Sequence, residues 1–361
     1  MKKKVMVGMS GGVDSSVAAK LLLDGGYDVT GVTLKLFSDE DIVLEKKTRT
    51  CCSLTDVEDA RAVAYKLGFE HIVFNFKDKF REDVMQHFVQ SYLDGRTPNP
   101  CIECNKHIKF DKMLERAETL GYDYIATGHY AVKRLDEASG RNFLIRPKDR
   151  SKDQTYVLYG LTQKQLEKTL FPLGELNKAE VRTIAEASGL VNSRKPDSQD
   201  ICFVPDGDYA KFIRETSGAE IPEGDFTSID GQILGRHSGI INYTIGQRKG
   251  LGVAFGKPMF VLSKDAQSNR VILGGNDDLF SDTLIADDIN LISVPEITSP
   301  IRVTAKARYS QRETAATVSP YGDSRLKVVF EQPQRALACG QAVVFYDGDI
   351  VVGGGTICEV P

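Results

Sequence analysis

The first half of the chain alternates short apolar runs with stretches of helical periodicity. Residues 56–67 predict a helix between two apolar runs, and strands that alternate with helices form a doubly wound parallel sheet. In such an α/β fold ligands bind beyond the carboxyl ends of the strands, so we expect a crevice near Val7, Leu34 and Gly128. The runs expected to form the strands are residues 5–7, 29–36, 71–76 and 122–126.

The second half changes from helical to β-rich patterning. A capping-box pair, Asn177 and Glu180, opens a predicted helix that Gly189 ends. From about residue 206 helical periodicity fades, and Asp347-Gly348 between two apolar runs predicts a hairpin. We expect an α/β domain with a helical extension, a small β-rich central domain and a C-terminal β-barrel, over residues 1–205, 206–275 and 276–361.

Composition and charge narrow the class of protein. The chain has 361 residues, enough for several domains, and no run approaches the roughly 20 apolar residues that span a bilayer. The N-terminal MKKK leads directly into a predicted strand, without the apolar region of a signal peptide, so we expect a cytoplasmic protein. We also expect it to be a monomer. A net charge of −4 argues against a uniformly basic nucleic-acid coat but leaves room for a local RNA site.

The first apolar run leads into the sequence SGGVDSS at residues 10–16, followed by a predicted helix. Paired glycines allow close backbone approach, and amides and hydroxyls at a helix start bind anions, so this segment reads as a phosphate loop. It contains no lysine and is therefore not a Walker A loop. It resembles the loop of the N-type ATP pyrophosphatases, which implies cleavage of ATP between the α and β phosphates. The alternative is a simple Gly/Ser turn.

Two of the seven cysteines lie in polar segments that do not look like core. Cys104 follows two prolines that fix the backbone, and the nearby Lys106 favours a thiolate. Cys202 lies in the segment SQDICF at residues 198–203. A lone cysteine is often a small buried hydrophobic residue, and we interpret Cys339 and Cys358 in that way. The remaining pair, Cys51-Cys52, has no assigned role.

Six segments in order resemble the tRNA-specific 2-thiouridylase (MnmA) family. They are the phosphate loop, PNPCIECN at 98–105, ATGHY at 126–130, KDQ at 152–154, SQDICF at 198–203 and a Gln-Arg-containing stretch at 243–248. The resemblance implies that ATP adenylates C2 of wobble uridine 34 in tRNAs for Lys, Glu and Gln, and that sulfur then displaces AMP. It also implies Mg²⁺ with the ATP, and a sulfur-relay protein or cysteine desulfurase as partner.

The resemblance also carries over individual residues. It implies that Cys202 bears the sulfur as a persulfide, that Cys104 is the second catalytic cysteine, and that a disulfide between them forms during turnover. The residues implied for ATP are Gly8, Met9, Ser10, Gly11, Gly12, Val13, Asp14, Ser15, Leu34 and Gly128. The residues implied for tRNA are Asn99, Pro100, Cys101, His129, Lys152, Asp153, Gln154, Arg308, Tyr309 and Gln341.

Several of these assignments leave alternatives open. Asp14 either lies near Mg²⁺ or caps the helix, and Tyr309 either stacks on a base or packs the barrel. Where many members of the family have Asp, this chain has Cys101, so Cys101, Cys104 and Cys202 are also candidate ligands of a [4Fe-4S] cluster that would replace the persulfide. Zinc and a neutral substitution are further options.

Two other classes of function remain for comparison. The phosphate loop also suits amide-forming synthetases, which adenylate a small molecule and have no need of the two cysteine segments. A non-enzymatic RNA-binding protein is the other alternative, and the intact loop disfavours it. Residues 133–153 carry a net charge of +3, which supports RNA binding only modestly, because such stretches are usually solvated faces.

Overall fold

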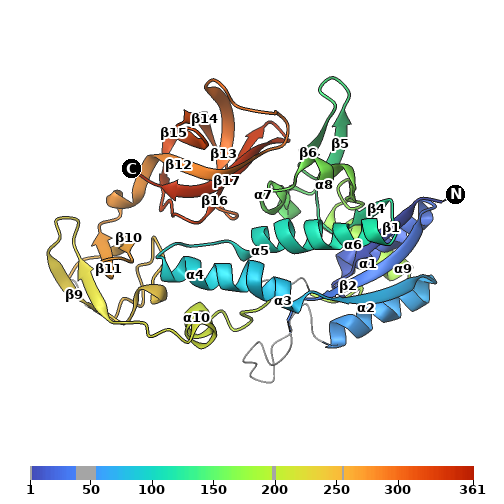
Figure 1. Ribbon diagram of the computed structural model, residues 1–361, viewed down its shortest axis with the longest axis horizontal. Coiled ribbons are helices and arrows are strands. Elements are labelled where there is room, and N and C mark those ends of the chain that lie inside the picture. Colours follow the sequence, from blue (N-terminus) through green and yellow to red (C-terminus); the bar gives the residue numbers. More distant parts are fainter. Residues whose placement is uncertain (1, 38–53, 197–200, 254–255) are drawn as a thin grey trace.

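A parallel sheet forms the centre of the first half of the chain. The computed structural model describes residues 2–37, 54–196, 201–253 and 256–361. The five strands have the order β3-β2-β1-β4-β7, and every neighbouring pair is parallel, which confirms the predicted doubly wound α/β fold (Figure 1). The strands are β1 (Lys4–Gly8), β2 (Asp28–Lys35), β3 (Glu70–Asn75), β4 (Tyr124–Ala126) and β7 (Thr169–Leu170).

Helices cover this sheet because their apolar faces are buried with it. Val17 of α1 (Val13–Asp24) and Val181 of α9 (Lys178–Ala187) lie in one apolar cluster with Val5 and Val7 of β1. The predicted capping box at the start of α9 is present, since Asn177 and Glu180 each accept from the other's backbone N–H. The remaining helix of this layer is α2 (Leu54–Leu67).

Two long helical stretches extend away from the sheet (Figure 1). The first runs through α3 (Lys77–Phe80), the π-helix η2 (Arg81–Gln86) and α4 (His87–Leu93). The second runs through α5 (Pro100–Glu103), the π-helix η3 (Cys104–Lys112) and α6 (Met113–Thr119). Shorter helices follow at η4 (Arg150–Lys152), α7 (Thr155–Leu158) and α8 (Gln163–Glu167).

The central part of the chain forms a four-stranded sheet and one helix. The helix α10 (Tyr209–Ser217) lies where the sequence suggested that helical periodicity fades. It is amphipathic, with Phe212 and Ile213 buried, and it begins at the cap Asp208 and ends at Gly218 in a left-handed conformation. The sheet has the order β10-β11-β8-β9, from β8 (Gly224–Thr227), β9 (Ile233–His237), β10 (Phe260–Asp265) and β11 (Arg270–Gly274).

The C-terminal part is a closed antiparallel barrel of six strands. Pairing runs from β12 through β15, β14, β13, β16 and β17 and returns to β12, which confirms the predicted barrel. The predicted hairpin is also present, because Asp347 pairs with Ile350 and Gly348 has φ +54°. The strands are β12 (Phe280–Leu291), β13 (Ile301–Lys306), β14 (Thr314–Tyr321), β15 (Arg325–Arg335), β16 (Ala342–Asp347) and β17 (Ile350–Glu359).

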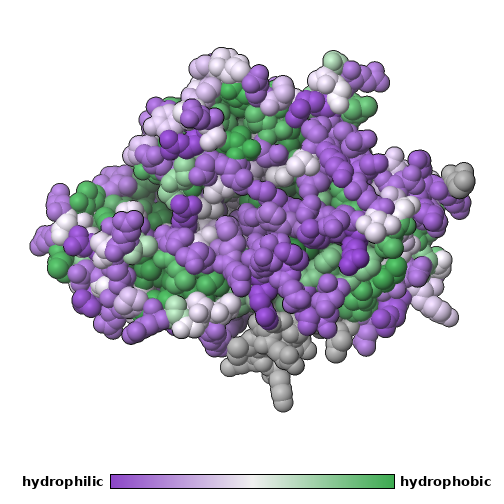
Figure 2. All heavy atoms as spheres, viewed as in Figure 1, coloured by the Kyte–Doolittle hydropathy of each residue, from purple (hydrophilic) through white to green (hydrophobic). Residues whose placement is uncertain are grey.

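The barrel also contacts the first half of the chain through a hairpin. Strands β5 (Val132–Asp136) and β6 (Arg141–Ile145) leave the parallel sheet after β4, and Ile145 pairs with Ile350 of β17. The face drawn in Figure 2 is largely hydrophilic, with apolar side chains in separate small areas. Within the ranges described, the helices are too short or too polar to cross a membrane.

Candidate active site

The predicted phosphate loop joins the carboxyl end of β1 to the first turn of α1. Gly11 has φ +69°, and a Cβ at this position would lie 2.5 Å from the carbonyl oxygen of Asp56, so only glycine fits. Gly12 is the N-cap residue of α1, and its carbonyl accepts hydrogen bonds from the hydroxyls of Ser15 and Ser16. These two hydroxyls therefore shape the loop from within.

Gly128 lies directly against this loop. A Cβ at Gly128 would lie 2.6 Å from the backbone nitrogen of Ser15 and 2.8 Å from the carbonyl carbon of Asp14. Because β1 and β4 are neighbours, their carboxyl ends bring Gly8 and Gly128 to one edge of the sheet. Leu34 lies near the carboxyl end of β2, the next strand. The structure thus gathers the residues predicted to bind ATP along one sheet edge.

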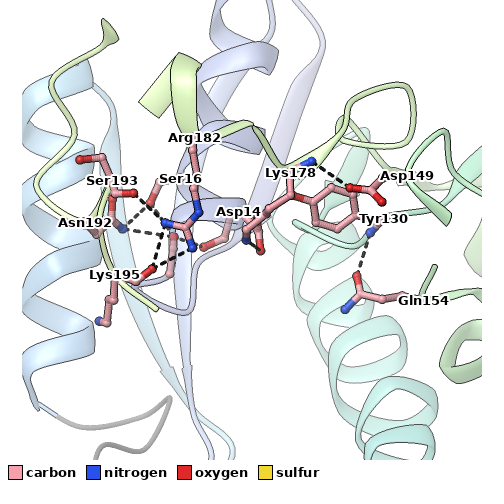
Figure 3. A network of polar contacts seen from close by, with 12 residues as sticks. Asp14, Ser16, Tyr130, Asp149, Gln154, Lys178, Arg182, Asn192, Ser193 and Lys195 are labelled. Carbon is pink, nitrogen blue, oxygen red and sulfur yellow. Dashed lines mark hydrogen bonds and ion pairs between the residues drawn. The ribbon is translucent and has the colours of Figure 1, made fainter. Parts of the chain in front are cut away.

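Asp14 occupies the first turn of α1 and faces a lysine. The ammonium group of Lys178 lies 2.7 Å from each carboxylate oxygen of Asp14, and the hydroxyl of Tyr130 donates to the same carboxylate at 2.8 Å (Figure 3). The alternative that Asp14 caps the helix is wrong, because Gly12 is the N-cap residue and α1 has no side-chain cap. Asp14 instead joins the loop to Tyr130, in the segment after β4, and to Lys178 of α9.

The segment that contains Cys104 begins at a well-formed helix start. Asn99 is the N-cap of α5 and accepts from the backbone N–H of Cys101 at 3.1 Å, and Pro100 occupies the first turn, where its missing N–H costs nothing. Cys101 is exposed, whereas Cys104, one turn later, is buried at the start of the π-helix η3. π-Helical segments are rare and are frequently found at functional sites, and here a nine-residue one begins at the predicted catalytic cysteine.

The two predicted catalytic cysteines share one apolar cluster. Cys104 is a buried member of this cluster, and Cys202 packs against it with its side chain half-buried. Phe203 anchors the chain next to Cys202, with ring centroids 5.4 Å from Phe88 and 5.2 Å from Phe212. Both cysteines thus border the same large apolar cluster, which extends from Leu36 to Ala338. Residues 198–200 of the SQDICF segment, like Cys51 and Cys52, lie outside the described residues.

The barrel brings three residues predicted to bind tRNA to the segment before Cys104. Arg308, Tyr309 and Gln341 line a cavity of about 230 Å³ together with Thr97, and Gln341 donates to the carbonyl of Thr97 at 2.8 Å. The guanidinium of Arg308 donates to the carbonyl of Ala336.

Tyr309 packs against the protein and is also accessible. Its ring lies 5.8 Å from that of Tyr156 and 5.4 Å from the ammonium group of Lys306, yet 46% of the residue is exposed. Both readings of Tyr309 therefore have support in the geometry, since it packs at the barrel and still presents surface to a ligand.

The remaining residues predicted to bind tRNA lie in the segment after β4 and around η4. Gln154 accepts from the backbone N–H of Tyr130 at 2.8 Å, and Asp153 lies 3.6 Å from Arg146. Lys152 ends η4 immediately before them. His129 lies 2.8 Å from the hydroxyl of Thr127, and burial, with a smaller contribution from Lys109, holds the pKa of His129 well below its usual 6.5. His129 is therefore neutral at pH 7.

The basic stretch at residues 133–153 is mostly committed to contacts within the protein. Arg141 donates to the carbonyls of Leu291 and Ile292, and Arg146 pairs with Glu313. Lys133, Lys148 and Arg150 contact the carbonyl of Glu167 and the carboxylates of Glu180 and Asp349. Arg141, Arg146 and Arg150 thus join the first half of the chain to the barrel, and the stretch gives RNA binding little support.

Comparisons with known proteins cover the whole chain. A family model described as the tRNA methyl transferase HUP domain matches residues 3–206, the tRNA methyl transferase PRC-barrel domain matches 210–275, and the aminomethyltransferase beta-barrel domain matches 281–357. The tRNA-specific 2-thiouridylase MnmA of Clostridioides difficile (strain 630) is 54% identical over 357 residues, covering 99% of this chain and 98% of that protein. The chain belongs to the tRNA-specific 2-thiouridylase family. The predicted resemblance is confirmed.

Other relatives agree with this assignment. The tRNA-specific 2-thiouridylase MnmA 1 of Thermoanaerobacter sp. (strain X514) is 55% identical over 359 residues, covering 99% of both chains. Among solved structures, a 4-thiouridine synthetase in complex with RNA and ATP matches 59% of this chain and 50% of its own, at 16% identity and a TM-score of 0.37. The family assignment rests on the full-length relatives and not on this structural match.

For this member of the 2-thiouridylase family, the sequence reading missed a group of residues behind the phosphate loop. The side-chain amide of Asn192 donates to the carbonyls of Gly11 and Gly12 and to the hydroxyl of Ser16, at 2.9–3.1 Å. The ammonium of Lys195 contacts Gly11, Asp56 and Asp59. Burial alone would lower the pKa of Lys195, but its hydrogen bonds to Asp56 and Asp59 outweigh burial and raise the pKa. The sequence does contain one signal for this group, the polar residues 192–195 that follow directly after the predicted helix end.

The side chains of this 2-thiouridylase do not form a resident metal site within the described part of the chain. No three His, Cys, Asp or Glu side chains there are grouped so as to hold an ion. Both oxygens of Asp14 accept from Lys178, which does not suit a Mg²⁺ ligand. Cys101, Cys104 and Cys202 are not grouped as three ligands in the described part of the chain, so as placed they do not fit the [4Fe-4S] alternative.

Proposed function

We propose that this protein is an ATP-dependent tRNA 2-thiouridylase acting on wobble uridine 34 of tRNAs for Lys, Glu and Gln. The observation that carries this proposal is identity of 54% and 55% to two proteins named tRNA-specific 2-thiouridylase, over 99% of this chain. Supporting it, the two cysteines implied for sulfur transfer pack in one apolar cluster. An amide-forming synthetase would have no use for that pair.

ATP activates the uridine in the first half of the proposed reaction. The C2 oxygen of the uridine bonds to the α-phosphorus of ATP as the bond to the β-phosphate breaks, and pyrophosphate departs. Residues 8–15, with Leu34 and Gly128, bind the nucleotide in this proposal, which rests on their gathering at one sheet edge. Mg²⁺ enters on the phosphates as part of the MgATP substrate. Backbone amides at the start of α1 stabilise the charge on the departing pyrophosphate.

Sulfur replaces oxygen in the second half. The terminal sulfur of a persulfide on Cys202 attacks C2, and AMP leaves with the former carbonyl oxygen. The thiolate of Cys104 then attacks Sγ of Cys202, which breaks the S–S bond, releases 2-thiouridine and leaves a disulfide between the two cysteines. An external thiol reductant supplies two electrons to restore both thiols. A sulfur-relay protein or cysteine desulfurase reloads Cys202.

The tRNA substrate occupies the surface between the α/β domain and the barrel in this proposal. The cavity lined by Arg308, Tyr309 and Gln341 lies beside the segment that leads to Cys104, which supports placing the wobble base there. Neutral His129 and the exposed ring surface of Tyr309 suit stacking on bases displaced from the anticodon loop. Asn99, Pro100 and Cys101, and Lys152, Asp153 and Gln154, complete the proposed contacts.

The proposed arrangement has three domains, at residues 1–205, 206–275 and 276–361, in a cytoplasmic monomer. A titration of the protein with tRNA under native mass spectrometry tests the monomer directly. One protein bound per tRNA supports it, and a two-to-one complex contradicts it.

The proposed function is tested with purified protein, MgATP and a tRNA transcript that carries uridine 34. We expect pyrophosphate release that depends on the tRNA, and none with a matched transcript carrying cytidine 34. Release that persists without tRNA, or that couples to ammonia and a small carboxylic acid, would identify an amide-forming synthetase instead. Binding of tRNA without any pyrophosphate release would indicate an RNA-binding protein that has lost catalysis.

A further inference from the structure

The phosphate loop has no lysine of its own, but a lysine from a distant helix reaches it. The first residue of α9, Lys178, places its ammonium group 2.7 Å from both carboxylate oxygens of Asp14, in the first turn of α1. The Lys178 side chain is only 13% exposed, and the Asp14 side chain is 31% exposed. Figure 3 shows Asp14 between the group of Lys178, Tyr130 and Asp149 and the group around Asn192.

Several contacts fix the position of Lys178. Its backbone N–H donates to the carboxylate of Asp149 at 3.0 Å, and the capping box of Asn177 and Glu180 holds the first turn of α9. Its ammonium group lies 5.9 Å from the centre of the Tyr130 ring, whose hydroxyl donates to Asp14. The lysine therefore approaches the loop from a rigid helix start, which is the kind of support that a binding residue needs.

Charge explains why a cation is required at this point. A carboxylate in the first turn of α1 lies where the helix start would otherwise attract the phosphates of ATP. An unpaired Asp14 would repel them, whereas Asp14 paired with Lys178 is neutral overall. An ammonium group has three donors, so it can contact a carboxylate and a phosphate oxygen together.

The other lysine near the loop does not fit this role. Lys195 contacts the carboxylates of Asp56 and Asp59 and the carbonyl of Gly11, so two negative charges already surround it. The side chain of Asp56 is 7% exposed, which places this cluster in the interior behind the loop. Lys195 therefore braces the loop from behind, whereas Lys178 contacts the first turn of α1 through Asp14.

We propose that Lys178 is the phosphate-binding lysine of this ATP site, and that Asp14 positions it. This inference rests on the proposed function, because it assumes that the loop binds ATP. Lys178, although distant in sequence, then provides the positive charge that a Walker A loop obtains from a lysine within the loop itself. It contacts the triphosphate and stabilises the charge that develops on pyrophosphate as it departs.

A double-mutant cycle separates phosphate binding from simple neutralisation of Asp14. We would measure the affinity for Mg²⁺ and α,β-methylene ATP, without tRNA, in Lys178→Met, Asp14→Asn and the double variant. Charged hydrogen bonds of this kind account for about a tenfold change in affinity or more, so Lys178→Met should bind at least about tenfold more weakly. We expect the double variant to remain as weak as Lys178→Met. Recovery of wild-type affinity in the double variant would overturn the proposal.

Two controls make the result interpretable. Lys148→Met removes the same charge from a surface lysine that pairs with Glu180 of α9, and it should leave the affinity unchanged. Adenosine, which lacks phosphates, should bind Lys178→Met and wild type equally, whereas a merely misfolded variant would lose both ligands. Wild-type protein that binds neither ligand would refute the proposed function, while a Lys178→Met variant with wild-type affinity would refute only the role of Lys178.

Discussion

The hydroxyl of Tyr130 donates a hydrogen bond to the carboxylate of Asp14 at 2.8 Å. The backbone N–H of the same tyrosine donates to the side chain of Gln154, also at 2.8 Å. One buried residue thus connects the phosphate loop to the segment 152–154, which the family resemblance assigns to tRNA (Figure 3). The two proposed substrate sites of the enzyme share this tyrosine.

Replacing Tyr130 with Phe should weaken ATP binding and leave tRNA binding nearly unchanged. The variant keeps the ring and its packing but removes the donor to Asp14, and the backbone N–H still reaches Gln154. A hydrogen bond to a charged group contributes about 1.5–3 kcal/mol, so we expect roughly tenfold or greater loss of ATP affinity. Isothermal titration of each substrate measures this.

Tyr122→Phe is the matched control for that variant. Its hydroxyl donates to the hydroxyl of Thr30 at 2.9 Å, a contact that does not involve the loop. Equal loss of ATP affinity in both variants would show that the effect comes from general loss of stability. Unchanged ATP affinity in Tyr130→Phe would show that its contact with Asp14 does not support the ATP site.

Gly128→Ala should destabilise the protein and the ATP site together. The new methyl group would lie 2.6 Å from the backbone nitrogen of Ser15, and the nearest atoms are backbone atoms of Asp14 and Ser15 in α1, which cannot move aside as a flexible side chain could. Overpacking of this kind costs about 1–3 kcal/mol. Gly160→Ala is the control, because its methyl group would meet only the end of Lys106, at 3.9 Å. Thermal melting with and without ATP measures both effects, and equal melting temperatures for the two variants would contradict the account.

Local signals in the sequence located several of the elements but missed α10, which lies where helical periodicity was expected to fade. The contacts within the site required the fold. The capping box at Asn177 and the turn at Gly348 depend on neighbouring residues, so pattern alone located them. The contact of Lys178 with Asp14 spans 164 positions, and that of Asn192 with Gly11 spans 181. No local periodicity encodes such pairs, because the topology of the sheet and the packing of α9 on α1 create them.

Lys195→Met should lower stability more than it lowers the intrinsic ATP affinity. The variant leaves the carboxylate of Asp56, with a side chain 7% exposed, without its lysine partner. Removing one partner of a buried or half-buried pair costs about 1–3 kcal/mol. Adding Asp56→Asn removes the carboxylate that Lys195 contacted, so the double variant should regain part of the lost stability. Urea unfolding measures this, and a double variant less stable than Lys195→Met would contradict the assigned pairing.

The pH dependence of stability should contain a contribution from His129. Burial lowers the pKa of His129 below 6.5, so the unfolded chain binds a proton that the folded protein excludes. The free energy of unfolding therefore decreases as the pH falls from 6.5 toward the folded-state pKa of His129. Above pH 6.5 His129 is neutral in both states, so this loss of stability is absent there. We expect His129→Asn to reduce this slope in urea unfolding at pH 5.5 to 7.5. A slope that is the same in wild type and variant would contradict the assigned burial effect.

The central claim is that ATP activates the wobble uridine and that Cys202 delivers sulfur to it. The most direct measurement compares wild type with Cys202→Ser, given uridine-34 tRNA, MgATP, a reductant and a cysteine desulfurase with cysteine, by nucleoside mass spectrometry and pyrophosphate release. We predict 2-thiouridine at position 34 only with wild type, and tRNA-dependent pyrophosphate release with both proteins. Formation of 2-thiouridine by Cys202→Ser at the wild-type rate would contradict the account.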